Sequence, residues 1–241
     1  EDGNVLAVYS LSPKKKITVH AIVMIRTSPI ANSSHKEVFL QEHLNPFKYW
    51  ESSDPQILKI GKELITAEKI YDYVVSTLDY SYEKIANNNV RLGAKETIKK
   101  PQFSVCLEFT DLFIALSRAA GIPARSVEGY ANTQNSKLRP LSLVKDILHA
   151  WPEYYDKEKK QWVMVDPTWG NTTSGLDYFH TFDFDHIVFV RKGMDSTYPI
   201  AAGGYKFDDD TKDISVEYLD PSEFVSIETT GARSSTLLRF G

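Results

Sequence analysis

The stretch 103–113 constrains this chain most, because it places the only cysteine at the start of a strongly periodic segment. Apolar residues recur there at helical spacing and form one stripe, made of Phe109, Leu112, Phe113, Leu116, Ala119 and Ala120. Gly121 and Pro123 are typical of the end of such a helix. We therefore expect Cys106 at the helix N-terminus, where the helix dipole and unpaired backbone N–H groups favour a thiolate.

A single cysteine also has an ordinary explanation, since free cysteine often serves only as a small buried core residue. One cysteine excludes an intrachain disulfide and leaves the redox compartment unmarked. The net charge of −4 argues against nucleic acid as the main partner. No apolar run approaches the length of a membrane span. Because the sequence begins with Glu, we expect a fragment or a processed form whose targeting segment has been removed.

Helical and strand patterns are mixed along the chain, which indicates an α+β fold. Asp54-Pro55 has the form of a helix start, and helix is expected to about Leu78, with breaks around Gly61 and Thr66. β-Branched and aromatic residues predict strands at 17–26, 124–131, 147–155, 161–166, 186–190 and 213–218. Residues 171–183 are expected to form a loop.

Three regions follow from these patterns. Residues 1–53 form a β-rich N-terminal extension, residues 54–200 form the core, and residues 201–241 form a C-terminal β extension of the same domain. With 241 residues, the chain is long enough to bury a sizeable core. The division therefore predicts one large domain with appended segments.

The strands 147–155 and 161–166 predict a hairpin with a testable register. If residues 156–159 form the turn, counting back along both strands places His149 opposite Asp166, with Cβ atoms roughly 4.5–5.5 Å apart. A carboxylate at that position accepts a hydrogen bond from the imidazole and fixes its tautomer. The alternative is a structural polar pair at the strand end, which is common in proteins.

A cysteine at a helix start, a histidine on a strand and an opposed aspartate are the parts of an activated thiol nucleophile. Cys106 would attack a carbonyl carbon, His149 would hold the thiol proton, and Asp166 would orient His149. The backbone N–H of Cys106 and the side chain of Gln102 are candidate oxyanion donors. Trp169 is a candidate wall of the substrate cleft. No metal site is expected, since Asp208-Asp209-Asp210 is more typical of a solvated acidic turn than of a calcium loop.

Three sequence blocks carry a resemblance to the transglutaminase-like superfamily, within the papain-like cysteine enzymes. The blocks are Cys106-Leu107-Glu108-Phe109 running to Arg125, His149-Ala150-Trp151-Pro152-Glu153-Tyr154, and Trp162-Val163-Met164-Val165-Asp166-Pro167-Thr168. The resemblance covers about residues 55–170, with a weaker likeness to bacterial and archaeal members through 198–205. It implies a triad of Cys106, His149 and Asp166, a nucleophile helix packed on an antiparallel sheet, and no cofactor. Ser104 departs from the family, which usually has glycine there.

We therefore expect a thiol-dependent acyl-transfer enzyme that acts on protein or peptide amides through a Cys106 thioester. Two reactions are possible: hydrolysis or deamidation, in which water accepts the acyl group, and transamidation, in which an amine accepts it. Of the two, we favour hydrolysis or deamidation. The alternative is a catalytically silent transglutaminase-like binding or scaffold module of an envelope protein, and the Ser104 departure is compatible with it. An extracytoplasmic location is expected, and the sequence does not indicate an oligomeric state.

Overall fold

The computed structural model describes residues 2–6, 8–15, 17, 25, 40–86, 90–131, 148–173, 175–182 and 185–201. Residues Glu1–Ala201 form one compact unit, and the predicted C-terminal extension belongs to a second unit that lies outside the described residues. The strands predicted at 17–26 and 213–218 also lie outside them, apart from Ile17 and Ile25. The proposed division of the chain at residues 53 and 200 stays a prediction.

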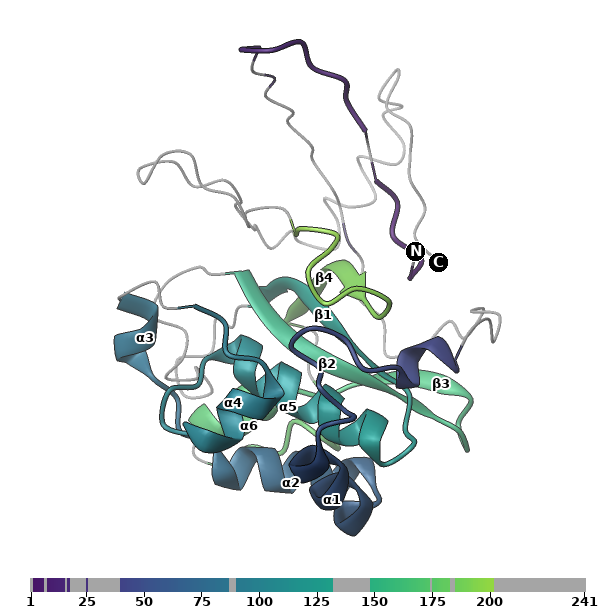
Figure 1. Cartoon of the computed structure of the whole chain (residues 1–241), viewed down its shortest axis with the longest axis vertical. Helices are drawn as coiled ribbons and strands as arrows, with labels where there is room; N and C mark the ends of the chain where they lie inside the picture. Colours follow the sequence, from purple (N-terminus) through teal and green to yellow (C-terminus); the bar gives the residue numbers. More distant parts are fainter. Residues whose placement is uncertain are drawn as a thin grey trace, which may run out of the picture. The chain divides into compact units, whose positions relative to one another are not determined.

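The described helices and strands have the following bounds (Figure 1). The helices are η1 Glu42–Leu44, α1 Pro55–Leu64, α2 Ala67–Thr77, α3 Tyr82–Ala86, α4 Ala94–Lys99, α5 Cys106–Ala119 and α6 Pro167–Thr172. The strands are β1 Ala124–Ala131, β2 Leu148–Asp156, β3 Gln161–Met164 and β4 His186–Lys192. Helices and an antiparallel sheet are therefore combined, and the predicted α+β class is confirmed.

Helices α1 and α2 each begin after a residue whose side chain caps the helix N-terminus. The carboxylate of Asp54 accepts a hydrogen bond from the backbone N–H of Gln56 at 3.0 Å, and Thr66 caps α2 in the same way. Gly61 does not break the helix, because it lies inside α1. A Cβ at Gly61 would lie 2.8 Å from the Cβ of Ala119, so the glycine allows α1 to approach α5 closely.

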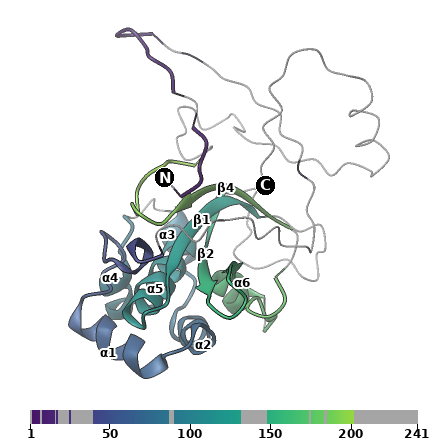
Figure 2. The same cartoon turned by 90° about the vertical axis from the view of Figure 1, so that its right-hand side faces the viewer.

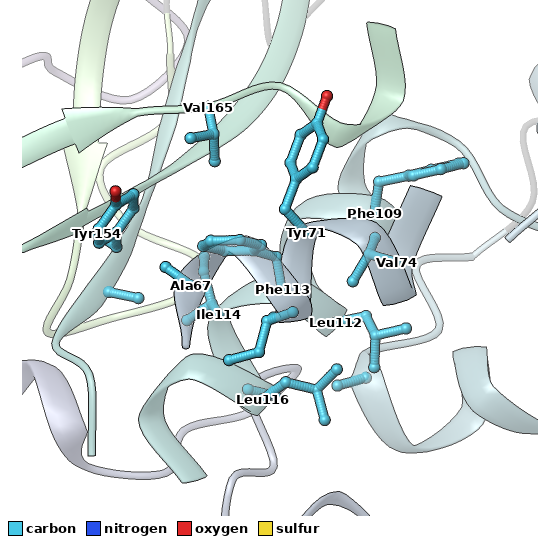
Figure 3. Packing of buried hydrophobic residues seen from close by; sticks show 14 of the residues in the cluster. Ala67, Tyr71, Val74, Phe109, Leu112, Phe113, Ile114, Leu116, Tyr154 and Val165 are labelled. Carbon is cyan, nitrogen blue, oxygen red and sulfur yellow. The ribbon is translucent and has the colours of Figure 1, made fainter. Parts of the chain in front are cut away.

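Helix α5 lies at the centre of the apolar core (Figure 2). Its side chains interlock with those of α2 and of the strands, as Figure 3 shows for Phe113, Tyr71 and Tyr154. The predicted stripe is buried at Phe109, Leu112, Phe113 and Leu116, each 0% exposed. Because this helix is held on several sides, its first residue has a fixed position relative to the sheet.

The sheet has the order β3-β2-β1-β4, and all its neighbours are antiparallel. The predicted hairpin register is wrong by two residues, since Asp156 faces Gln161 and the turn is 157–160. The side chain of Asp156 explains the shift: it accepts hydrogen bonds from the N–H groups of Glu158 and Lys159, each at 2.9 Å, and so caps the turn from the last strand position. Strand β3 ends at Met164, and His149 pairs with Gly129 of β1.

The N-terminus of α5 is fixed by one buried carboxylate. Glu108 is 0% exposed, and its oxygens accept hydrogen bonds from the backbone N–H of Val105 at 3.1 Å and of Leu92 at 2.9 Å. The ammonium group of Lys84 lies 2.7 Å from the same carboxylate and donates to the carbonyl of Phe103. Glu108 thus fixes the segment before the helix.

We expect Glu108→Gln to destabilise the fold by about 3–5 kcal/mol, because it leaves the buried ammonium of Lys84 without its charged partner. Denaturant unfolding measures this change. The matched control is Glu96→Gln, which breaks the exposed pair with Lys99 and should leave stability nearly unchanged. Equal effects of the two variants would contradict an anchoring role for Glu108.

Candidate active site

Cys106 is the first residue of α5, as predicted, and its side chain is partly exposed. Ser104 lies two residues earlier, is 0% exposed and donates a hydrogen bond from Oγ to the carbonyl of Pro101 at 2.9 Å. Its own carbonyl accepts from the N–H of Ser81 at 2.8 Å. Ser104 therefore packs beneath the segment that leads to Cys106 and does not cap the helix, whose N-cap is Val105.

Asp166 occupies the position directly before α6. Its Oδ1 accepts a hydrogen bond from the backbone N–H of Trp169 at 3.0 Å, which makes it the N-cap of that helix. Asp166-Pro167 repeats the helix-start signal of Asp54-Pro55, so the sequence contained the information for α6. The sequence prediction nevertheless lacked this helix, since a strand was expected to Asp166 and a loop from residue 171.

His149 and Asp166 are hydrogen-bonded, with Nε2 of the imidazole 2.8 Å from Oδ2 of the carboxylate. The side chain of His149 is 9% exposed and that of Asp166 is 0% exposed. The predicted hydrogen bond is present, although the register that suggested it is wrong. It forms because the cap position of α6 brings Asp166 past the end of β3 and towards His149 of β2.

A second histidine contacts the same carboxylate oxygen. Nε2 of His186, the first residue of β4, lies 3.0 Å from Oδ2 of Asp166, and its side chain is 0% exposed. Sequence reasoning placed His186 only at the start of a strand. Asp166 follows β3 and His186 begins β4, and these two strands lie at opposite edges of the sheet. A local sequence pattern therefore cannot predict their contact.

These contacts set the charge states of the cluster. Burial alone would raise the pKa of Asp166, but the charge and hydrogen bond of His149, together with the hydrogen bond of His186, leave that pKa lowered. Burial alone would lower the pKa of His149, but the charge and hydrogen bond of Asp166 and the hydrogen bond with Cys106 raise it to about 10. His149 is therefore an imidazolium at neutral pH. Because its Nε2 is bonded to Asp166, Nδ1 is the ring atom left for Cys106.

The other candidate residues have different surroundings. Gln102 is exposed in the turn before α5. Trp169 is 1% exposed and packs against the rings of His149 and His186, with centroids 5.9 and 4.5 Å away, so it supports the histidines from the interior. Tyr80 was not singled out from the sequence. Burial and then the charge of Cys106 raise the pKa of its phenol.

His149, Asp166 and His186 also have the donor atoms of a metal site, all within 4.8 Å of one another. The two short contacts to Asp166 have the lengths of direct hydrogen bonds. Such bonds require the protons that a metal would displace. We therefore describe the three residues as a hydrogen-bonded cluster.

The described residues therefore combine a central helix that begins at a cysteine with a hydrogen-bonded histidine and aspartate beside an antiparallel sheet, in a mixed α+β fold of papain-like type. Residues 54–167 match the family model of the transglutaminase-like superfamily. The match agrees with the resemblance seen in the sequence, and the predicted recognition is confirmed. No curated protein matches the chain.

Several solved structures are similar to part of this chain. A "putative cysteine protease" from Cytophaga hutchinsonii is 25% identical, with a TM-score of 0.45 over 64% of this chain and 49% of its own. The periplasmic domain of TgpA from Pseudomonas aeruginosa is 21% identical, with a TM-score of 0.40 over 59% of this chain and 52% of its own. Its ethylmercury-bound form is 20% identical, with a TM-score of 0.40 over 57% and 51%. The chain spans about half the length of these structures.

None of the helices in the described ranges combines the length and the apolar character that crossing a membrane requires.

Replacing Asp166 should change how stability depends on pH. The raised pKa of His149 adds stability that is complete below its usual value of 6.5 and is lost as pH rises towards 10. The lowered pKa of Asp166 adds stability that is complete above 3.8 and is lost in acid. Denaturant unfolding of the wild type should therefore show the free energy of unfolding falling both at high pH and in acid. Asp166→Asn should lower the free energy of unfolding near pH 6 and make both falls smaller.

The matched control is Asp177→Asn, which removes the carboxylate bonded to the exposed His180 at 2.7 Å. Exposed pairs contribute little, so this variant should keep the pH profile of the wild type. An unchanged profile in Asp166→Asn would contradict the coupling of His149 to Asp166.

Proposed function

We propose that this domain is a thiol-dependent acyl-transfer enzyme that acts on protein or peptide amides through a thioester on Cys106. The observation that carries the proposal is the hydrogen bond between His149 and the buried Asp166, on a histidine whose pKa is raised by Asp166 and also by Cys106. An imidazolium held beside a thiol favours the thiolate, which is the nucleophilic form. Cys106 is also partly exposed, as a nucleophile that meets a substrate must be.

In the first half of the reaction, Sγ of Cys106 attacks the amide carbon and forms a tetrahedral intermediate. The negative oxygen is stabilised by backbone N–H groups at the start of α5, where the helix dipole adds to their effect. His149 then gives a proton to the departing nitrogen, the carbon–nitrogen bond breaks, and a thioester remains on Cys106. Asp166 keeps His149 in the orientation that this transfer requires.

In the second half, water or an amine attacks the thioester while His149 removes its proton. The new bond to oxygen or nitrogen forms as the carbon–sulfur bond breaks, which restores the thiolate and the imidazolium. Attack by water gives hydrolysis or deamidation, and attack by an amine gives transamidation. The same residues therefore serve both outcomes, and the acceptor decides between them.

Burial of the acidic and aromatic residues near the site favours water as the acceptor. A lysine acceptor would benefit from exposed carboxylates and aromatic walls. Three residues of these types, Glu108, Glu153 and Trp169, are only 0, 2 and 1% exposed. Glu108 is paired with Lys84, and Glu153 is paired with Arg125. An amine must outcompete water at roughly 55 M, and these residues offer it little help.

Iodoacetamide labelling tests the nucleophile without knowledge of the substrate. The native protein should label at pH 7 about tenfold or more faster than His149→Ala, because an ordinary thiol is only a few per cent thiolate at that pH. Cys106→Ala should not label, since the chain has one cysteine. Labelling only after denaturation would overturn the enzyme proposal and favour the binding module.

A glutamine-containing peptide library tests the acceptor. The protein is incubated with the library, with and without a primary amine, and peptide masses are followed. Cleavage, or the gain of about 1 Da when an amide becomes an acid, is expected to dominate, because water is favoured as the acceptor. Stoichiometric incorporation of the amine with little hydrolysis would show that the protein is a transferase instead.

A further inference from the structure

We propose that His186 is a positioning residue that holds the Asp166 carboxylate in place for His149, so that the working unit has four members rather than three. The inference rests on the proposed thiol chemistry, because it assigns a role within that site. His186 contacts Asp166 directly, so its influence on Cys106 passes through Asp166 and His149.

The hydrogen bonds of Asp166 define its orientation completely. Oδ1 accepts from the N–H of Trp169 at 3.0 Å, and Oδ2 accepts from His149 at 2.8 Å and from His186 at 3.0 Å. An ionised carboxylate only accepts hydrogen bonds, so Nε2 of each histidine must carry a proton. Without His186, Oδ2 loses one of its two hydrogen-bond donors. The remaining donor then offsets less of the cost of burying the charged carboxylate.

A bulge in the sheet brings His186 to this position. The pairing of β1 with β4 shifts between Glu128 and Gly129, because Glu128 faces Val190 and Gly129 faces Val188. Phe189 of β4 is left without a partner on β1. Because side chains alternate between the two faces of a strand, this extra residue reverses the face to which the residues from Val188 back to His186 point. Without that shift, His186 would point to the opposite face of the sheet.

With the shift, His186 shares a face with His149. Gly129 pairs with both His149 and Val188, and directly paired residues point to the same side. His186 lies two residues from Val188 along β4 and therefore also points to that side. Gly129 is required by this geometry, since a Cβ there would lie 1.9 Å from the carbonyl oxygen of Ile187.

Aromatic side chains fix the ring of His186. Its centroid lies 4.5 Å from those of Trp169 and Phe182 and 4.9 Å from that of Trp151. The side chain of His186 is 0% exposed. A ring enclosed in this way has little freedom to rotate, so its Nε2 stays directed at Asp166. These contacts also suit a phenylalanine, which makes a conservative removal of the hydrogen bond possible.

The test compares His186→Phe, which keeps an aromatic ring without a donor, with His186→Gln, whose amide can again donate to Asp166. The readout is the rate of Cys106 labelling by iodoacetamide at pH 7. We expect a loss of roughly 10–100-fold in His186→Phe, the scale seen for residues that orient a functional side chain, and substantial recovery in His186→Gln. His180→Gln is the control and should label like the wild type, since His180 is exposed.

A packing role alone would predict the reverse order, with the aromatic variant retaining more reactivity than the glutamine variant. Wild-type labelling in a folded His186→Phe variant would also overturn the proposal. A measurement on the native protein covers the case in which the variants do not fold. Nitrogen-15 NMR should show Nε2 of His186 protonated at pH 7, and an unprotonated Nε2 would exclude the role. If the wild type itself does not label, it is the proposed function that fails.

Discussion

The buried carboxylate of Asp166 is the interaction on which the candidate site depends. It accepts N–H groups from three elements: Trp169 of α6, His149 of β2 and His186 of β4. A buried anion is costly unless such donors surround it, and these supply the compensation. The same carboxylate therefore links α6 to strands β2 and β4 of the sheet.

The other half of the site depends on buried charges around α5. Glu108 bonds to the segment before the helix and to Lys84, while Asp111 one turn later is paired with Arg91 and accepts from the indole of Trp50 at 2.8 Å. Burial raises the pKa of Asp111 to about 6, so its charge at neutral pH depends on Arg91. Carboxylates and cations therefore tie the start of α5 to Lys84, Arg91 and Leu92. The position of Cys106 follows from these contacts rather than from the loop before it.

Signals contained in a short segment were predictive. The stripe from Phe109 to Leu116 fixed the course of α5 and put Cys106 at its start, and Asp54-Pro55 marked the start of α1. The hairpin register failed because Asp156 takes part in the strand while its side chain caps the turn, a dual role that composition does not reveal. The contact of His149 with Asp166 does not depend on that register, because Asp166 lies beyond the end of β3, and its position as the N-cap of α6 directs it towards His149.

Long-range features could not be derived in this way. The contact of His186 with Asp166 depends on a one-residue shift in the pairing of β1 with β4. Gly129 is the sequence feature that accompanies this shift, but a glycine in a strand does not by itself identify a bulge. The burial of Glu108 likewise depends on Lys84, which is distant in the sequence. Such contacts are set by tertiary packing, which a single sequence does not display.

The protonation state of His149 in the native protein tests the account most directly. Nitrogen-15 NMR can follow both ring nitrogens as a function of pH. The account predicts an imidazolium at pH 7 that loses its proton only near the raised pKa of about 10, with the proton on Nε2 retained in the bond to Asp166. A His149 that titrates near its usual value of 6.5 would contradict it, because Asp166 would then not hold the charge that the thiol chemistry requires.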